Sequence, residues 1–127
     1  MHLVSWNCRG LGNPRKVEAV KDLLKIEPSD ILMIQETKIE GKALLDISKK
    51  KWKKSEGIAV NSRGSSRGLA TLWAKELFQL TKTHETRHWI FTELTHSSSK
   101  MSISLFNLYV PVLNSKKEIV GTLLMIT

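Results

Sequence analysis

The fold is decided by residues 3–36, LVSWNCRGLGNPRKVEAVKDLLKIEPSDILMIQE. The apolar run at 3–6 predicts a strand, Pro14 is well placed to open a helix that runs to residue 26, and ILMI at 31–34 predicts a second strand buried on both faces. A strand, a helix and a second strand form a βαβ unit, whose strands are parallel as a rule. The carboxyl ends of the two strands are then expected at one edge of a sheet.

Both predicted strands end on polar residues. Asn7 closes the first strand, and Gln35 and Glu36 close the second. Asparagine packs poorly on a pleated surface, so Asn7 marks either a turn or a ligand position. Open α/β sheets bind ligands outside the carboxyl ends of their strands, so Asn7 and Glu36 are expected to converge. An amide oxygen beside a carboxylate suits Mg²⁺, although both residue types also cap helices and close turns.

The remaining pattern predicts further strands. After a weakly helical stretch at 41–50, GIAVNS at 57–62 and GLATLWA at 68–74 predict an antiparallel pair around the loop RGSSR. WIFTEL at 89–94 and MSISLFNLYV at 101–110 predict two more strands joined by the turn HSSSK. The tail at 116–127 is expected to begin a helix. The predicted fold class is α/β, with a meander joined to the parallel unit in a mixed sheet.

Length and charge restrict the class of protein. The chain has 127 residues, which allows one domain, and its net charge of +8 favours polyanionic partners such as nucleic acid. Cys8 is the only cysteine, which indicates a reducing compartment and an intracellular, nuclear or cytoplasmic protein that is not secreted. No apolar run is long enough to span a membrane, so no membrane partner is expected. The run KKKWKK at 49–54 favours a solvated loop with one buried tryptophan over a phosphate-binding segment.

Four segments, SWNCRGLGNPR, QETK, SSRGLATLW and NLYVP, occur in this order. Together they resemble the endonuclease/exonuclease/phosphatase superfamily, and especially the apurinic-like endonuclease domains of plant non-long-terminal-repeat retrotransposon polyproteins. The resemblance implies a four-layer α/β sandwich of the deoxyribonuclease I-like type. It further implies Mg²⁺, with Mn²⁺ as the substitute, held by Asn7 and Glu36, and a Tyr109 that contacts the scissile phosphate. The implied chemistry is Mg²⁺-assisted hydrolysis of a phosphodiester in DNA.

Several of these candidate residues also have a purely structural explanation. Tyr109 is equally compatible with a half-buried aromatic residue of a strand, and for Asn107 a turn is the preferred interpretation. Arg15, Arg63 and Arg67 are candidates for contact with a nucleic-acid backbone. Arg15 also fits a solvated helix start, and Gly64 and the serines between the other two arginines fit an ordinary hairpin loop.

The later motifs of the superfamily, a GDFN-like and an SDH-like segment, do not occur, and no aspartate or histidine follows Tyr109. A general base contributes roughly 10²- to 10⁴-fold to a hydrolysis rate. Residues 1–127 are therefore expected to form a single partial domain without the carboxyl-terminal half, to be catalytically incomplete, and to lack most of the second sheet. An exposed sheet face would then favour self-association. The alternatives are a basic nucleic-acid-binding remnant and a structural remnant with no ligand.

Overall fold

A computed structural model describes residues 2–8, 13–26, 30–37, 39–61, 68–112 and 117–126. Its elements are β1 (Leu3–Asn7), α1 (Asn13–Ile26), β2 (Ile31–Gln35), α2 (Gly41–Lys51), β3 (Ser55–Val60), β4 (Leu69–Ala74), β5 (Phe78–Glu85), β6 (Trp89–His96), β7 (Ser102–Val112) and β8 (Lys117–Ile126). The strands form a first sheet in the order β1-β2-β4-β3 and a second sheet in the order β5-β6-β7-β8.

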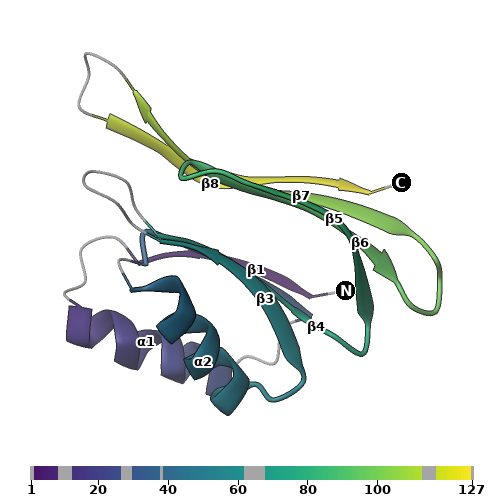
Figure 1. Ribbon diagram of the computed structural model, residues 1–127, viewed down its shortest axis with the longest axis horizontal. Coiled ribbons are helices and arrows are strands. Elements are labelled where there is room, and N and C mark those ends of the chain that lie inside the picture. Colours follow the sequence, from purple (N-terminus) through teal and green to yellow (C-terminus); the bar gives the residue numbers. More distant parts are fainter. Residues whose placement is uncertain are drawn as a thin grey trace.

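The two sheets pack face to face, and α1 and α2 cover the other face of the first sheet (Figure 1). Within the described ranges no helix covers the outer face of the second sheet. The expectation that most of the second sheet is missing is therefore wrong, because residues 78–126 supply four of its strands. The layers observed are helices, sheet and sheet. None of the described helices is long and apolar enough to cross a membrane.

The predicted βαβ unit is confirmed. β1 and β2 are parallel and in register over five residue pairs, and every residue of β2 is buried. β4 pairs antiparallel with the other side of β2, and β3 forms the outer edge of the first sheet. The antiparallel pair predicted around RGSSR is thus also confirmed, although it extends the first sheet rather than the meander. β2 lies between two strands and between two packed layers.

The second sheet is a simple meander, as predicted, but two of its strands differ from the expectation. β5 was not predicted, because all its residues after Phe78 are exposed and show no apolar alternation. The helix expected in the tail is wrong: residues 117–126 form β8, which pairs antiparallel with β7 from Ile103↔Ile126 to Val112↔Lys117. The β-branched residues Ile119, Val120, Thr122 and Ile126 favour this extended conformation.

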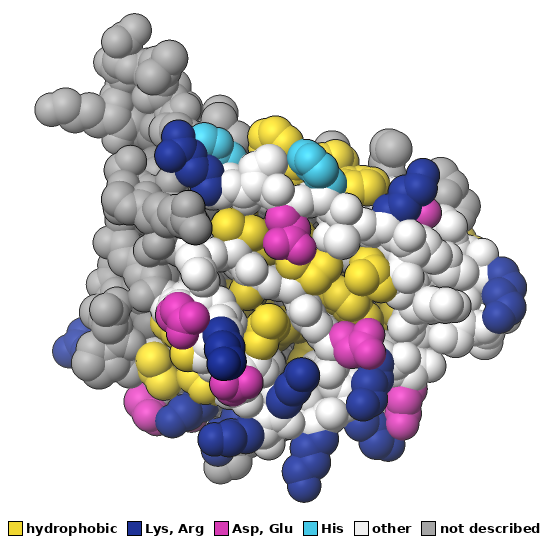
Figure 2. All heavy atoms as spheres, viewed as in Figure 1, with side chains coloured by type: hydrophobic (Ala, Val, Ile, Leu, Met, Phe, Trp, Pro, Cys, Tyr) yellow, Lys and Arg dark blue, Asp and Glu magenta, His cyan; other side chains and the backbone are white. Residues whose placement is uncertain are grey.

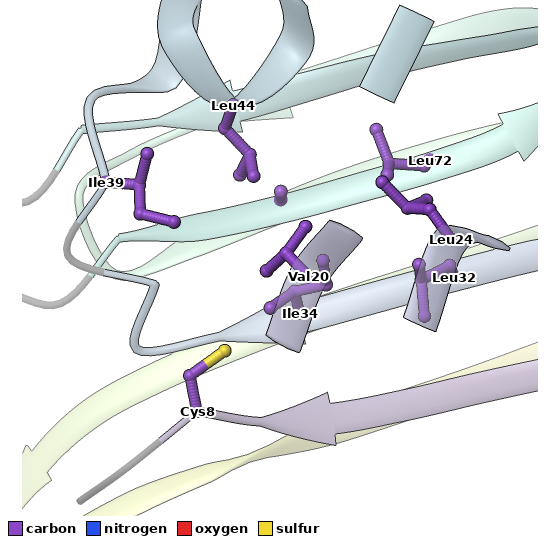
Figure 3. Packing of buried hydrophobic residues seen from close by; sticks show 9 residues of the cluster. Cys8, Val20, Leu24, Leu32, Ile34, Ile39, Leu44 and Leu72 are labelled. Carbon is purple, nitrogen blue, oxygen red and sulfur yellow. The ribbon is translucent and has the colours of Figure 1, made fainter. Parts of the chain in front are cut away.

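Two apolar clusters lie on either side of the first sheet. Leu32 and Ile34 of β2 face the helices and pack with Val20, Leu24, Leu44 and Leu72 (Figure 3). The alternate residues Ile31 and Met33 face the second sheet and pack with Trp73, Phe78, Leu94, Ile103 and Leu105. This alternation fixes the register of β2, since a slip of one residue would exchange its two faces.

In the lysine run at 49–54 the lysines are exposed and the tryptophan packs against the core, as the sequence predicted. Trp52 is half-buried and packs against the helix-side cluster, while the lysines around it are exposed. Lys49, Lys50 and Lys51 form the last turn of α2 rather than a loop. Cations at this end of a helix are favourable because the free carbonyl groups carry partial negative charge.

Candidate functional site

The candidate site lies where β1 and β2 end side by side. The strands are in register up to Asn7↔Gln35, and beyond that pair the amide of Cys8 donates to the carbonyl oxygen of Gln35 over 3.0 Å. Neighbouring strands lie about 4.8 Å apart, so the backbones of Asn7 and Glu36 are close neighbours at this edge. The structure thus brings the two residues together, while their metal-binding role stays a prediction.

Asn7 and Glu36 lie in different environments. Asn7 is exposed as the last residue of β1, whereas Glu36 is only 2% exposed and both of its carboxylate oxygens are shielded from solvent. Removing an ionised carboxylate from water is costly unless other charged or polar groups compensate. A carboxylate buried at the end of a strand is typical of a functional position rather than of a solvated turn.

The backbone of Glu36 is left-handed, with φ of 55°. For a residue with a side chain this conformation costs about 1–2 kcal/mol, and it persists where the surrounding structure holds it. It also interrupts the alternation of the strand, so β2 ends at Gln35. Strained residues of this kind are concentrated at functional sites.

A buried side chain from the second sheet reaches the end of β2. Asn107 of β7 is fully buried, and its side-chain nitrogen donates to the carbonyl oxygen of Ala70 over 2.8 Å. The same nitrogen lies 3.3 Å from the carbonyl oxygen of Ile34 and 3.3 Å from Oγ1 of Thr71. Its side-chain oxygen accepts a hydrogen bond of 2.9 Å from Nε2 of Gln35. The predicted turn at Asn107 is wrong, since this residue lies within a strand and bonds across the two sheets.

The hydrogen-bond network continues from Gln35 to β1. Nε2 of Gln35 also donates to Oγ of Ser5 over 3.1 Å, and Gln35 itself is 2% exposed. On the other side of Glu36, the amide of Thr37 donates to the carbonyl oxygen of Gly68 over 3.0 Å. The residues before and after Glu36 are therefore both fixed by hydrogen bonds.

Tyr109 approaches the same edge. β7 runs alongside β2 in the same direction, since Ile103 and Leu105 share a cluster with the first half of β2 and Asn107 bonds to Gln35. The backbone of Tyr109 follows about 7 Å beyond Asn107, toward the edge where β1 and β2 end. The side chain of Tyr109 lies outside the described part of the structure, so its contact with a phosphate stays a prediction.

The three candidate arginines are placed only in part. Arg15 is exposed in the first turn of α1, which begins at the same edge because it follows β1. Arg63 and Arg67 lie outside the described residues. Their neighbours Asn61 and Gly68 lie just after β3 and just before β4, at that edge of the first sheet. Of the three, only Arg15 has a described position from which it could reach a bound nucleic acid.

The oxygen donors at this edge fit one kind of metal ion. Mg²⁺ usually binds one or two carboxylates and keeps several water ligands, which matches a Glu36 carboxylate and an Asn7 amide oxygen. No group of three or more His, Cys, Asp or Glu that could hold a metal occurs among the residues described. By their chemistry these two oxygen donors suit Mg²⁺, with water or other groups supplying the remaining ligands.

A pocket of about 720 Å³ opens farther along the same edge, between the start of α2, the end of β3 and the turn from β5 to β6. Its charged lining residues are Glu40, Lys42, Asp46, Lys49, Glu85 and Arg87. Neither Asn7 nor Glu36 lines it. Because its charges balance, this pocket has no evident preference for an anion, and the strand ends remain the candidate site.

Several solved structures resemble the chain in fold. A humanized D. rerio TDP2 with 14 mutations aligns with a TM-score of 0.67 at 14% identity, over 90% of this chain and 49% of that one. D. rerio TDP2 complexed with a single-strand DNA product aligns with a TM-score of 0.67 at 13% identity, over 91% and 48%. AP endonuclease LMAP from Leishmania major gives 0.61 at 18% identity, over 85% and 39%. The chain spans about half or less of these structures, and the likeness shows the fold alone.

The sequence itself identifies the family. No curated protein matches the chain, but residues 4–98 match the Endonuclease/Exonuclease/phosphatase family. The matched segment contains both Asn7 and Glu36 and makes up the greater part of the chain. The two packed sheets with helices on one face agree with the deoxyribonuclease I-like fold expected for it. The chain therefore belongs to the endonuclease/exonuclease/phosphatase family.

Proposed function

We propose that the chain is part of a Mg²⁺-dependent endonuclease domain of retrotransposon origin that hydrolyses phosphodiesters in DNA. The observation that carries this proposal is the buried carboxylate of Glu36, which directly follows the residue paired with Asn7 at the ends of β1 and β2. The opening SWNCRGLGNPR and the three motifs that follow it support the retrotransposon origin. Family membership supports a phosphoester-hydrolysing chemistry.

In this proposal Asn7 and Glu36 hold the metal through oxygen atoms and leave other positions for water and substrate. A bound Mg²⁺ would polarise a phosphoryl oxygen and stabilise the negative charge that develops on it. Tyr109, whose backbone lies toward the same edge, is assigned to the scissile phosphate. Arg15 is assigned to the phosphate backbone beside it.

The 127 residues by themselves are proposed to be catalytically incomplete. Activation of the attacking water needs a general base, and this chain has no aspartate or histidine after Tyr109. The described residues near Glu36 offer no cluster of acidic groups or histidines that could replace it. Groups from another polypeptide segment would have to complete the site.

DNA is the proposed partner because of charge. The net charge is +8, and on the face shown in Figure 2 Lys and Arg side chains outnumber the acidic ones among them. This charge also favours the alternative function, a nucleic-acid-binding remnant without hydrolysis. In either case counterion release makes binding fall steeply with salt concentration.

Self-association is a further part of the proposal, through the outer face of the second sheet. Phe91 and Phe106 are cross-strand partners on that face, and their ring centroids lie 4.8 Å apart. Both rings are only half-buried, since no described helix covers them. An aromatic pair of this kind can bury further apolar area against a second copy.

The first test is metal binding. Mn²⁺ is titrated into the purified chain, and free Mn²⁺ is followed by electron paramagnetic resonance. We expect one Mn²⁺ site that Mg²⁺ displaces, and we expect Glu36→Gln to weaken it by about tenfold or more. The matched control is Glu56→Gln, which removes the same charge from an exposed position in β3 and should leave the affinity unchanged.

The second test is nicking of supercoiled plasmid in Mg²⁺, with and without EDTA. Intact plasmid together with Glu36-dependent Mn²⁺ binding is the result expected of an incomplete site. EDTA-sensitive nicking that Glu36→Gln abolishes would overturn the proposed incompleteness. Mn²⁺ binding that is absent, or equally strong in Glu36→Gln, would overturn the metal site itself.

A further inference from the structure

The carboxamide of Asn107 links the two sheets, and both its nitrogen and its oxygen have hydrogen-bond partners in the first sheet. Its nitrogen has the carbonyl oxygens of Ala70 and Ile34 and the hydroxyl of Thr71 within 3.3 Å, and its oxygen accepts from Gln35. A buried asparagine in a strand between apolar neighbours is costly unless its polar atoms are satisfied, and here they are. The residue thus selects one alignment of β7 against β2 and β4.

The hydrogen bonds of Asn107 lie next to Glu36, the residue of the candidate site whose backbone is left-handed. Gln35, which Asn107 holds, is the last residue of β2, and Glu36 follows it with φ of 55°. Thr37 is then fixed by the bond from its amide to Gly68. A left-handed glutamate needs its neighbours held on both sides, because released backbone would relax to a more favourable conformation.

We propose that Asn107 is a positioning residue for Glu36. Through Gln35 it holds the end of β2, so that the Glu36 backbone stays left-handed and its carboxylate stays at the metal site beside Asn7. This inference rests on the proposed metal-binding function. Metal binding at Glu36 then depends on the second sheet as well, because the residue that positions Glu36 comes from β7.

The inference is tested with Asn107→Leu, which keeps a similar size but removes the donors and the acceptor. We expect the dissociation constant for Mn²⁺ to rise by about tenfold or more, as for loss of other groups that orient metal ligands. Gln35→Met removes the hydrogen bond between Gln35 and Asn107, together with the one from Gln35 to Ser5, and it should weaken Mn²⁺ binding in the same direction. This second variant keeps the test available if Asn107→Leu does not fold.

Leu105→Ala is the matched control. Leu105 is fully buried two residues earlier in β7, so its truncation destabilises the same strand without touching the hydrogen-bond network. Among folded molecules it should leave the Mn²⁺ affinity unchanged. A purely structural role for Asn107 would make the two variants behave alike.

Hydrogen exchange gives a readout that does not depend on metal. The amide of Thr37 is protected by its bond to Gly68, and in Asn107→Leu we expect it to exchange about tenfold faster than in Leu105→Ala. Wild-type Mn²⁺ affinity and unchanged Thr37 exchange in a folded Asn107→Leu would overturn the inference alone. Mn²⁺ binding that does not depend on Glu36 would overturn the proposed function and the inference together.

Discussion

Replacing Gly57 of β3 with alanine should destabilise the domain strongly. A Cβ at this position would lie 2.2 Å from Cδ2 of Leu72, 3.1 Å from Cδ2 of Leu45 and 3.0 Å from the carbonyl oxygen of Thr71. Carbon atoms prefer separations of about 3.5–4.0 Å, so the Leu72 methyl must retreat by more than about 1 Å. Leu72 is fully buried in the cluster beneath α2, so its side chain has to repack against other buried residues. We therefore expect a cost of about 2–3 kcal/mol, the upper part of the range for overpacking.

The assay is thermal unfolding followed by circular dichroism. For a domain of this size the cost corresponds to a fall in Tm of roughly 8–12 °C. The control is Gly41→Ala at the start of α2, where a Cβ would meet the side-chain oxygen of the exposed Asn61 at 2.7 Å. Asn61 is exposed and can move, at the loss of the hydrogen bond that its side-chain oxygen accepts from the amide of Gly41, so Tm should fall by less than for Gly57→Ala. If Gly57→Ala lowers Tm by less than roughly 2 °C, the close packing of α2 on β3 is refuted.

Three further outcomes are expected. Mg²⁺ at one hundred times its dissociation constant should stabilise the folded chain by about 2.7 kcal/mol in thermal melts, and a tenfold or greater loss of affinity in Glu36→Gln should reduce this gain to about 1.4 kcal/mol or less; a wild-type Tm indifferent to Mg²⁺ would contradict it. Affinity for duplex DNA, measured by fluorescence anisotropy, should fall linearly on a log–log plot against salt, and Arg15→Gln should reduce the slope by about 0.9; salt-independent binding would disprove the phosphate contacts. Phe106→Lys should lower the sedimentation-derived association constant, and undiminished association would exclude the outer face of the second sheet.

The parallel unit could be predicted because its signals are local. ILMI is apolar on both faces, and the helix before it repeats apolar residues at helical spacing, so neither segment needs knowledge of a distant partner. The polar residues at the strand ends then followed from the general position of ligand sites in such sheets. The same reasoning selects Asn7 and Glu36 as candidate site residues, and their role stays a prediction.

The two misjudged strands lacked such signals. Apart from Phe78, β5 is exposed along its whole length, so its sequence reads as a polar connection. β8 contains the run Leu123–Ile126, which fits a helix or a strand equally well, and only its pairing with β7 decides between them. For β8, tertiary pairing overrode an ambiguous local pattern.

The hydrogen-bond partners of Asn107 could not be predicted from the sequence for a related reason. Its partner Gln35 lies 72 residues away, and its partner Ala70 lies 37 residues away. The one visible signal was a polar residue inside an apolar strand, which is equally typical of a turn. Only the packing of one sheet on the other reveals which polar atoms satisfy it.

The strand orders of the two sheets also have a kinetic consequence. In the second sheet every strand pairs with its neighbour in sequence, whereas in the first sheet β2 must find β4 across about thirty residues of intervening chain. Contacts between distant segments form slowly because loop closure costs entropy before any pairing is gained. During refolding we expect the hairpins of residues 78–126 to form early and to present a surface on which the first sheet assembles. The ends of β1 and β2 would then be among the last parts of the chain to take their final arrangement.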